Sequence, residues 1–116
     1  MSSFFSGFGT SSSSSGILYL NYTLVTHSES PYTTLSTDSF IGVDSSGGTV
    51  SILLPNAPTT GRVYVIKDAF GSAYTHNITV TTVGGTVLID SLTTYVLNTA
   101  YEGAQFLFNG TEYLIF

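Results

Sequence analysis

The sequence contains no cysteine and very few basic residues. Without cysteine the chain can have no disulfide framework, no thiolate metal site and no thiol nucleophile. Arg62 and Lys67 are the only Lys or Arg side chains among 116 residues, and the formal net charge is −5. Because binding to a nucleic-acid backbone depends on clustered Lys and Arg side chains, we expect no nucleic-acid partner.

Charged residues and long hydrophobic runs are also scarce. Asp, Glu, Lys and Arg make up 8% of the residues, against about 25% in an ordinary globular domain, yet the mean hydropathy is +0.33. The longest apolar blocks, "SILLP", "VYVI" and "YLIF", have the length of strands and fall far short of the ~20 residues that cross a bilayer. We therefore expect no membrane insertion, and we expect apolar side chains to fill a core and contacts between subunits.

The chain from residue 17 onward is typical of a β domain. No ten-residue stretch keeps a helical period without interruption, so we expect almost no helix. Turn residues separate short apolar runs at 17–25, 39–44, 49–55, 62–68, 77–83, 86–90, 94–98, 104–108 and 111–116. This pattern predicts one all-β domain over residues 17–116, a small antiparallel β-sandwich or barrel-like fold, and leaves the strand order open.

The clearest local signal is a closing hairpin. Asn109-Gly110 stands between two apolar runs, and this dipeptide favours a type I′ turn because both central residues of that turn need positive φ. The aromatic and aliphatic residues of this hairpin are Phe106, Phe108, Tyr113, Ile115 and Phe116. An apolar strand end is normally paired or covered, so we expect Phe116 to lie inside a sheet or at a subunit contact.

Residues 1–16 differ from the rest of the chain. The stretch "SSFFSGFGTSSSSSG" sets Phe4, Phe5 and Phe8 among serine and glycine. A flexible Gly/Ser linker has no use for exposed aromatic rings. A segment that cannot fold alone but carries aromatic anchors is typical of a peptide that becomes ordered on another protein. We therefore interpret residues 1–16 as an extended docking arm with Phe4, Phe5 and Phe8 as its anchors.

The sequence offers no catalytic or cofactor-binding constellation. Many serines are present, but His27 and His76 are the only histidines and no "GxSxG" motif occurs, so we predict no enzyme activity and no cofactor. Spacing alone leaves a metal site of His27, His76 and an aspartate open, although histidines in surface loops are far commoner, and we predict no metal. "DSSGG" at Asp44 lacks the alternating acids of a calcium loop and indicates an Asx-type turn.

The tyrosines and the three charged residues near position 65 each have two possible roles. The tyrosines are Tyr19, Tyr22, Tyr32, Tyr64, Tyr74, Tyr95, Tyr101 and Tyr113. They can form a surface that stacks on host glycans, although strand tyrosines more often pack across strands or at subunit interfaces. Arg62, Lys67 and Asp68 lie on one predicted strand and its end, where they can pair across a subunit contact or form an ordinary exposed pair.

Residues from about 40 to 116 resemble a known module. The segments that carry the resemblance are "LPNAPTTGRVYVIKD", "NITV" and the closing "FNGTEYLI". They are similar to a β-structured module of bacteriophage and other virus structural proteins, often at the ends of fibre or spike chains. The resemblance implies a virion protein, homotrimeric and without catalytic residues.

The sequence departs from that module in its context, because the module makes up nearly the whole chain and no long shaft accompanies it. We therefore expect a homotrimeric capsid decoration, or cement, protein. Its arm, residues 1–16, would dock onto the major capsid protein or another virion protein. The alternative is a tail-fibre, baseplate or head-fibre tip module that binds a host-surface glycan.

Overall fold

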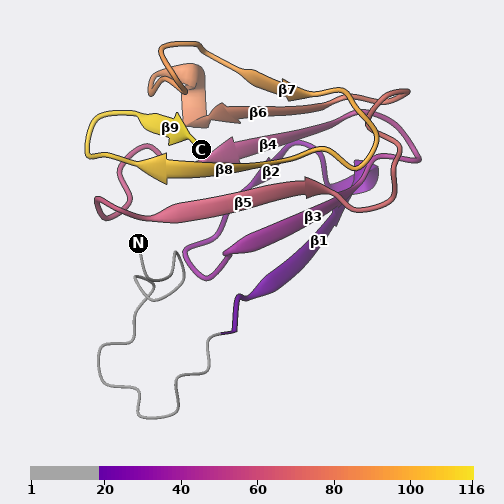
Figure 1. Ribbon diagram of the computed structural model, residues 1–116, viewed down its shortest axis with the longest axis horizontal. Coiled ribbons are helices and arrows are strands. Elements are labelled where there is room, and N and C mark those ends of the chain that lie inside the picture. The colour runs from indigo at the N-terminus through magenta and orange to yellow at the C-terminus, as the bar shows by residue number, and fades with distance from the viewer. Residues whose placement is uncertain (1–18) are drawn as a thin grey trace.

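The computed structural model of the protein describes residues 19–116 (Figure 1). The predicted docking arm, with Phe4, Phe5 and Phe8, lies outside these residues. Within them the chain forms two β-sheets around a single core, and the only helical elements of this part are two three-residue 3-10 segments, η2 (His27–Glu29) and η3 (Val83–Gly85). The prediction of a β domain with almost no helix is therefore confirmed.

Between residues 19 and 116, nine strands make up the two sheets. Sheet A contains, in spatial order, β1 (Tyr22–Thr26), β3 (Phe40–Asp44), β5 (Val63–Asp68), β8 (Gly103–Phe108) and β9 (Tyr113–Ile115). Sheet B contains, in spatial order, β2 (Tyr32–Thr33), β4 (Val50–Leu54), β6 (Ile78–Thr82) and β7 (Tyr95–Leu97). Neither sheet closes into a barrel.

The predicted antiparallel arrangement is wrong for most of the fold. From β1 to β6 the chain alternates between the sheets, and the pairs β1–β3, β3–β5, β2–β4 and β4–β6 are parallel. A parallel pair needs a crossover connection, which the intervening strand of the opposite sheet provides here. Only the pairs that involve β7, β8 and β9 are antiparallel. The chain therefore builds two mixed sheets, with parallel pairs among β1 to β6 and antiparallel pairs where β7, β8 and β9 are added.

One predicted strand, residues 86–90, is not formed. η3 follows β6 directly, and Gly84 and Gly85 adopt positive φ values of 71° and 68°. The chain then moves to the edge of sheet A, where Ile89 bridges Tyr113 in parallel. The Thr82 hydroxyl stabilises the path of the chain from β6 to this edge, because it donates to the Val87 carbonyl at 2.7 Å. Two glycines in succession therefore redirect the chain instead of closing a hairpin.

The core lies between the inner faces of the sheets. Alternate residues of each strand point inward, as the period of two requires. The fully buried core side chains include Val25, Ile41, Val43, Ile52, Leu54, Ile66, Ile78, Val80, Leu97, Phe106 and Tyr113. Tyr113 keeps its hydroxyl satisfied by donating to the Pro55 carbonyl at 2.7 Å. Burial raises the pKa of Tyr113 above its ordinary value, so the phenol stays neutral.

The closing hairpin forms, but with a different turn from the predicted one. β8 and β9 pair with Phe106 opposite Ile115 and Phe108 opposite Tyr113, so four residues connect the strands. Gly110 has φ 104°, whereas Asn109 is not in the left-handed region that a type I′ turn requires of it. The Asn109 side-chain oxygen instead accepts hydrogen bonds from the backbone N–H groups of residues 111 and 112, both at 2.9 Å. An Asx turn therefore closes the hairpin.

Candidate functional site

The outward-facing side of sheet A is unusually apolar. Strand register places Tyr22, Phe40 and Val65 side by side in one row across β1, β3 and β5. Their chain neighbours Ile41, Tyr64 and Ile66 point into the core, so these three face outward. We call the following set the outer face of sheet A: Tyr22, Leu24, Phe40, Gly42, Val65, Lys67, Gly103, Gln105, Leu107 and Leu114.

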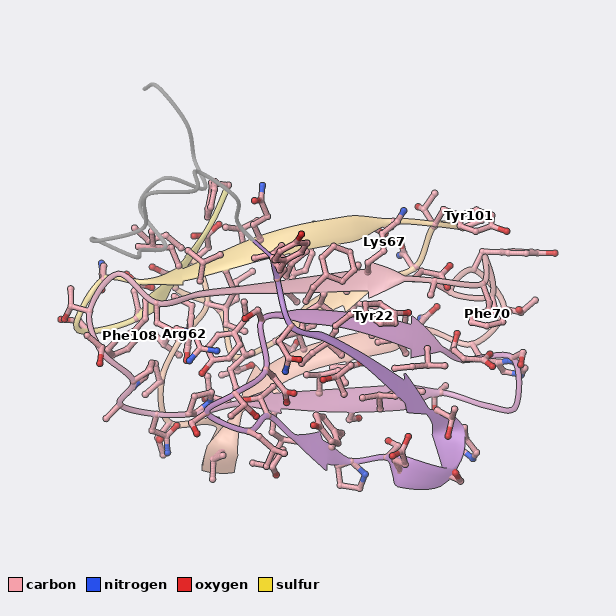
Figure 2. The ribbon with its side chains drawn as sticks, turned by 90° about the horizontal axis from the view of Figure 1, so that it is seen from below. Tyr22, Arg62, Lys67, Phe70, Tyr101 and Phe108 are labelled. Carbon is pink, nitrogen blue, oxygen red and sulfur yellow. The ribbon has the colours of Figure 1, made fainter. Side chains whose placement is uncertain are left out.

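Two glycines allow long side chains to lie flat on this face. A Cβ atom added to Gly42 would lie 2.8 Å from the Tyr22 Cε1 atom, and one added to Gly103 would lie 3.0 Å from the Lys67 Cδ atom. The Tyr22 ring also packs beside Phe40, with 5.8 Å between the ring centroids. Tyr22 and Lys67 therefore lie across their neighbouring strands (Figure 2), and the result is a flat surface.

The outward-facing side of sheet B is different. Its outward positions alternate with the buried residues of β4 and β6, and they are mostly hydroxyl side chains. These positions are Thr33, Ser51, Leu53, Thr79, Thr81 and Val96. Hydroxyl groups hydrogen-bond to water and leave no large apolar area uncovered. The two faces therefore differ in chemistry, and the apolar one is on sheet A.

Of the two alternatives left open for Arg62, Lys67 and Asp68, the ordinary exposed pair is not formed within the subunit. Asp68 is fully buried, and Lys67 donates to the Tyr101 carbonyl instead. Arg62 donates to the backbone carbonyls of Ser36 and Asp38, and its guanidinium lies 4.2 Å from the Tyr64 ring centroid. Each of the three side chains therefore holds a loop or a ring within its own subunit, and Asp68 is no exposed partner.

Asp68 fastens two loops at one end of the molecule. Its carboxylate accepts backbone N–H groups of Gly71 at 3.0 Å, Ala73 at 3.0 Å and Tyr101 at 2.8 Å. It also accepts two longer bonds of 3.3 Å from Phe70 and Ser72. Burial alone would raise the pKa of Asp68, but these amide donors, Tyr101 foremost, hold that pKa below its ordinary value. The carboxylate therefore ties residues 69–77 to residues 98–102.

These two loops carry exposed aromatic rings. Phe70, Tyr74 and Tyr101, which we call the aromatic end, are 54%, 69% and 58% exposed. Tyr101 has φ 63°, a left-handed conformation that is uncommon for a bulky residue, and its ring lies against Gly71. Lys67 lies 5.6 Å from the Tyr101 ring centroid. Figure 2 shows Phe70 and Tyr101 toward one end of the molecule and Arg62 and Phe108 toward the other, with Lys67 between them on the side of Tyr101.

A second buried carboxylate, Asp38, was not anticipated from the sequence. It is 2% exposed and accepts hydrogen bonds from the Thr23 hydroxyl, the Tyr32 hydroxyl and the Leu35 amide at 2.7, 2.7 and 2.8 Å. Burial alone would raise the pKa of Asp38, but these donors and the Arg62 guanidinium hold it below its usual value. Desolvation and the Asp38 carboxylate raise the pKa of Tyr32 to about 12. Asp38 therefore joins β1 of sheet A to β2 of sheet B.

The two histidines have separate surroundings. The His27 ring packs against Gly48, and its Nδ1 lies 2.6 Å from the Thr49 carbonyl oxygen. The His76 amide donates to the Ser72 carbonyl at 2.9 Å. Across residues 19–116 no group of three or more His, Asp or Glu side chains is arranged to hold a metal ion.

Asp44 forms the predicted Asx-type turn by accepting the Ser46 amide at 3.0 Å.

No helix between residues 19 and 116 is long and apolar enough to cross a membrane. No protein-family model matches the chain, and no curated protein matches it. Function is therefore inferred from the two features that the fold builds, the outer face of sheet A and the aromatic end.

Proposed function

We propose that this protein is a structural component of a bacteriophage virion, most specifically a homotrimeric decoration protein of the capsid. The observation that carries the proposal is the apolar outer face of sheet A on a chain with 8% charged residues. A free monomer rarely exposes such a face, because uncovered apolar surface drives association. The assignment to the virion rests on the resemblance of "LPNAPTTGRVYVIKD" and "FNGTEYLI" to the module of virus structural proteins.

In this proposal residues 1–16 attach each subunit to the major capsid protein or to another virion protein. Phe4, Phe5 and Phe8 fill apolar pockets, and the small Ser and Gly residues let the backbone follow the partner's surface. Burying one Phe side chain contributes roughly 1.5–3 kcal/mol, which offsets part of the ~1–2 kcal/mol per residue needed to order the backbone. Three arms on one trimer bind together, so avidity adds to the strength of attachment.

Replacing Phe4, Phe5 and Phe8 with serine is expected to leave the trimer folded and to abolish its attachment to particles. Loss of three anchors at roughly 1.5–3 kcal/mol each lowers the affinity at least about a thousandfold. The measurement is co-sedimentation of the purified full chain with undecorated capsids. The control changes three serines of the same arm, 11 to 13, to alanine and is expected to co-sediment normally. Wild-type occupancy by the triple Phe variant would show that the arm is not the anchor.

The aromatic end favours a second candidate function, a fibre, baseplate or head-fibre tip that binds a host-surface glycan. Phe70, Tyr74 and Tyr101 are exposed, and Asp68 holds both of their loops. Aromatic rings that are fixed before a ligand arrives bind it without a further ordering cost. The strained φ of Tyr101 is the kind of backbone feature that clusters at ligand sites.

Host-surface glycans immobilised on an array test this second function. If the aromatic end binds them, Tyr101→Ala should weaken binding of the full chain about tenfold, the loss of roughly 1.4 kcal/mol. Tyr19→Ala is the matched control, because Tyr19 is 84% exposed and lies in neither loop. Equal binding by wild type and Tyr101→Ala would remove the aromatic end as a glycan site.

A further inference from the structure

We infer that the outer face of sheet A is the surface through which copies of this chain contact one another. The occupant of the face is therefore a second copy of the same protein. This inference rests on the proposed homotrimer and names the part of the subunit that builds it. It follows from the charge, the flatness and the edges of sheet A.

The outer face of sheet A carries no net charge, so two copies can meet there without repulsion. Lys67 belongs to the face, and Asp44, at the end of β3, points to the same side because Ile41 and Val43 point into the core. The positive charge of Lys67 and the negative charge of Asp44 cancel. The remaining charged residues of the sequence are Arg62 and six acids, two of which, Asp38 and Asp68, are buried. The outer face of sheet B is also uncharged, but its hydroxyl side chains leave little apolar area to cover, so the apolar area favours sheet A.

The same two groups make the face complementary to itself. Lys67 pairs in register with Gly42, and Asp44 lies two residues further along β3, so both charges sit at the same end of the sheet. In a three-fold assembly every copy presents its cation to one neighbour and its acid to the other. Lys67 of one copy and Asp44 of the next can therefore pair at the border of an otherwise apolar contact.

The edges of sheet A exclude a continuous sheet that joins β9 of one copy to β1 of the next. The outer edge of β9 is already bonded, since the Tyr113 amide donates to the Leu88 carbonyl at 2.9 Å and the Asp90 amide donates to the Tyr113 carbonyl at 2.8 Å. The Ile115 amide also donates to the Asp90 carboxylate at 3.2 Å. With that edge occupied, sheet A cannot be extended past β9 into a neighbouring copy.

A flat sheet face is suited to this kind of contact. Sheets pack face to face at about 10 Å when neither surface carries a bulky obstruction. Tyr22 lies over Gly42 and Lys67 over Gly103, so the longest side chains of the face fill depressions instead of standing upright. Leu24 and Leu114, on the outermost strands β1 and β9, extend the apolar area across the full width of the sheet.

The test compares three leucine or valine positions of nearly equal exposure. Leu24 and Leu114 on sheet A are 40% and 39% exposed, and Val96 on sheet B is 37% exposed. Each is changed to aspartate in the full chain, and light scattering coupled to size exclusion gives the mass at micromolar concentration. Wild type and Val96→Asp are expected at three times the 12.3 kDa chain mass. Leu24→Asp and Leu114→Asp are expected at the mass of one chain, with unchanged far-ultraviolet circular dichroism.

A charge exchange gives a second measurement that does not depend on the apolar substitutions. Lys67→Glu is expected to raise the dissociation constant of the trimer, and Lys67→Glu combined with Asp44→Lys is expected to restore it.

A trimer that persists in Leu24→Asp and Leu114→Asp as it does in wild type overturns the assignment of the face but leaves the proposed trimer standing. A wild-type chain that is monomeric overturns the proposed trimer itself, and the face with it. Dissociation by Val96→Asp equal to that by Leu24→Asp would overturn the preference for sheet A.

Discussion

Asp68→Asn is expected to lower the free energy of unfolding by about 3 kcal/mol or more. The carboxylate accepts five backbone N–H groups from two loops while fully buried. Asparagine keeps one accepting oxygen and brings an NH₂ group that faces other donors, so several buried N–H groups lose their partner, each at about 1–3 kcal/mol. Urea denaturation of the full chain, monitored by circular dichroism, measures the loss.

Asp90→Asn is the matched control. Asp90 is exposed and has φ 48°, a conformation that asparagine tolerates well. Its substitution removes a single accepted bond of 3.2 Å at most. We expect a change of less than about 1 kcal/mol for this variant. Equal losses in Asp68→Asn and Asp90→Asn would contradict the role of Asp68 as the fastening of the two loops.

The pH dependence of stability tests the same carboxylate without changing the fold. The pKa values of Asp68 and Asp38 are lowered in the folded protein relative to the ordinary 3.8. A depressed folded pKa stabilises the protein fully above the unfolded value, and this stabilisation is lost as pH falls through the folded value. Wild type is therefore expected to lose stability below about pH 4, and Asp68→Asn to lose less over that range. An equal loss of stability below this pH in wild type and Asp68→Asn would contradict the role of the Asp68 carboxylate.

The positions of the strands could be predicted from the sequence because alternation depends on local residues. The runs that became β3, β4, β5 and β6 start and end within a residue or two of their predicted limits. The direction of pairing could not be predicted in this way, since a strand with one buried face alternates identically in parallel and antiparallel sheets. Strand β2 has only two residues and left no pattern to detect.

The candidate sites were predictable only in part. Asp68 ends a predicted strand and precedes "AFGSA", whose Gly and Ser are typical of a turn in which backbone amides can close around a carboxylate, so its loop carries a local signal. Tyr101, the fifth donor, lies 33 residues away, and no local pattern connects the two. The outer face of sheet A likewise depends on which strands are neighbours. The run "RVYVIKD" predicts a strand, but it shows neither which strands lie beside it nor what covers its outer face.

Phe106→Ala is expected to lower the free energy of unfolding by about 3–5 kcal/mol, a large share of the ~5–15 kcal/mol that stabilises a domain. Phe106 lies on β8 with no exposed surface, and its ring meets Tyr95 of sheet B edge-on, with 6.0 Å between the centroids. Removal of the ring leaves a cavity between the sheets. Thermal unfolding of the full chain measures the effect, and the same loss of melting temperature is expected at every protein concentration.

Leu107→Ala, one residue along the same strand, separates the core from the proposed subunit contact. Leu107 points to the outer face of sheet A, where it lies opposite Leu114. When folding and association are linked, the melting temperature rises with protein concentration. We expect wild type and Phe106→Ala to show this dependence over the whole range of concentration, and Leu107→Ala to show it only at higher concentrations, where its weakened trimer still forms. A Leu107→Ala protein whose dependence begins at the same concentration as that of wild type would place the subunit contact elsewhere, because a side chain in the contact contributes to the free energy of association.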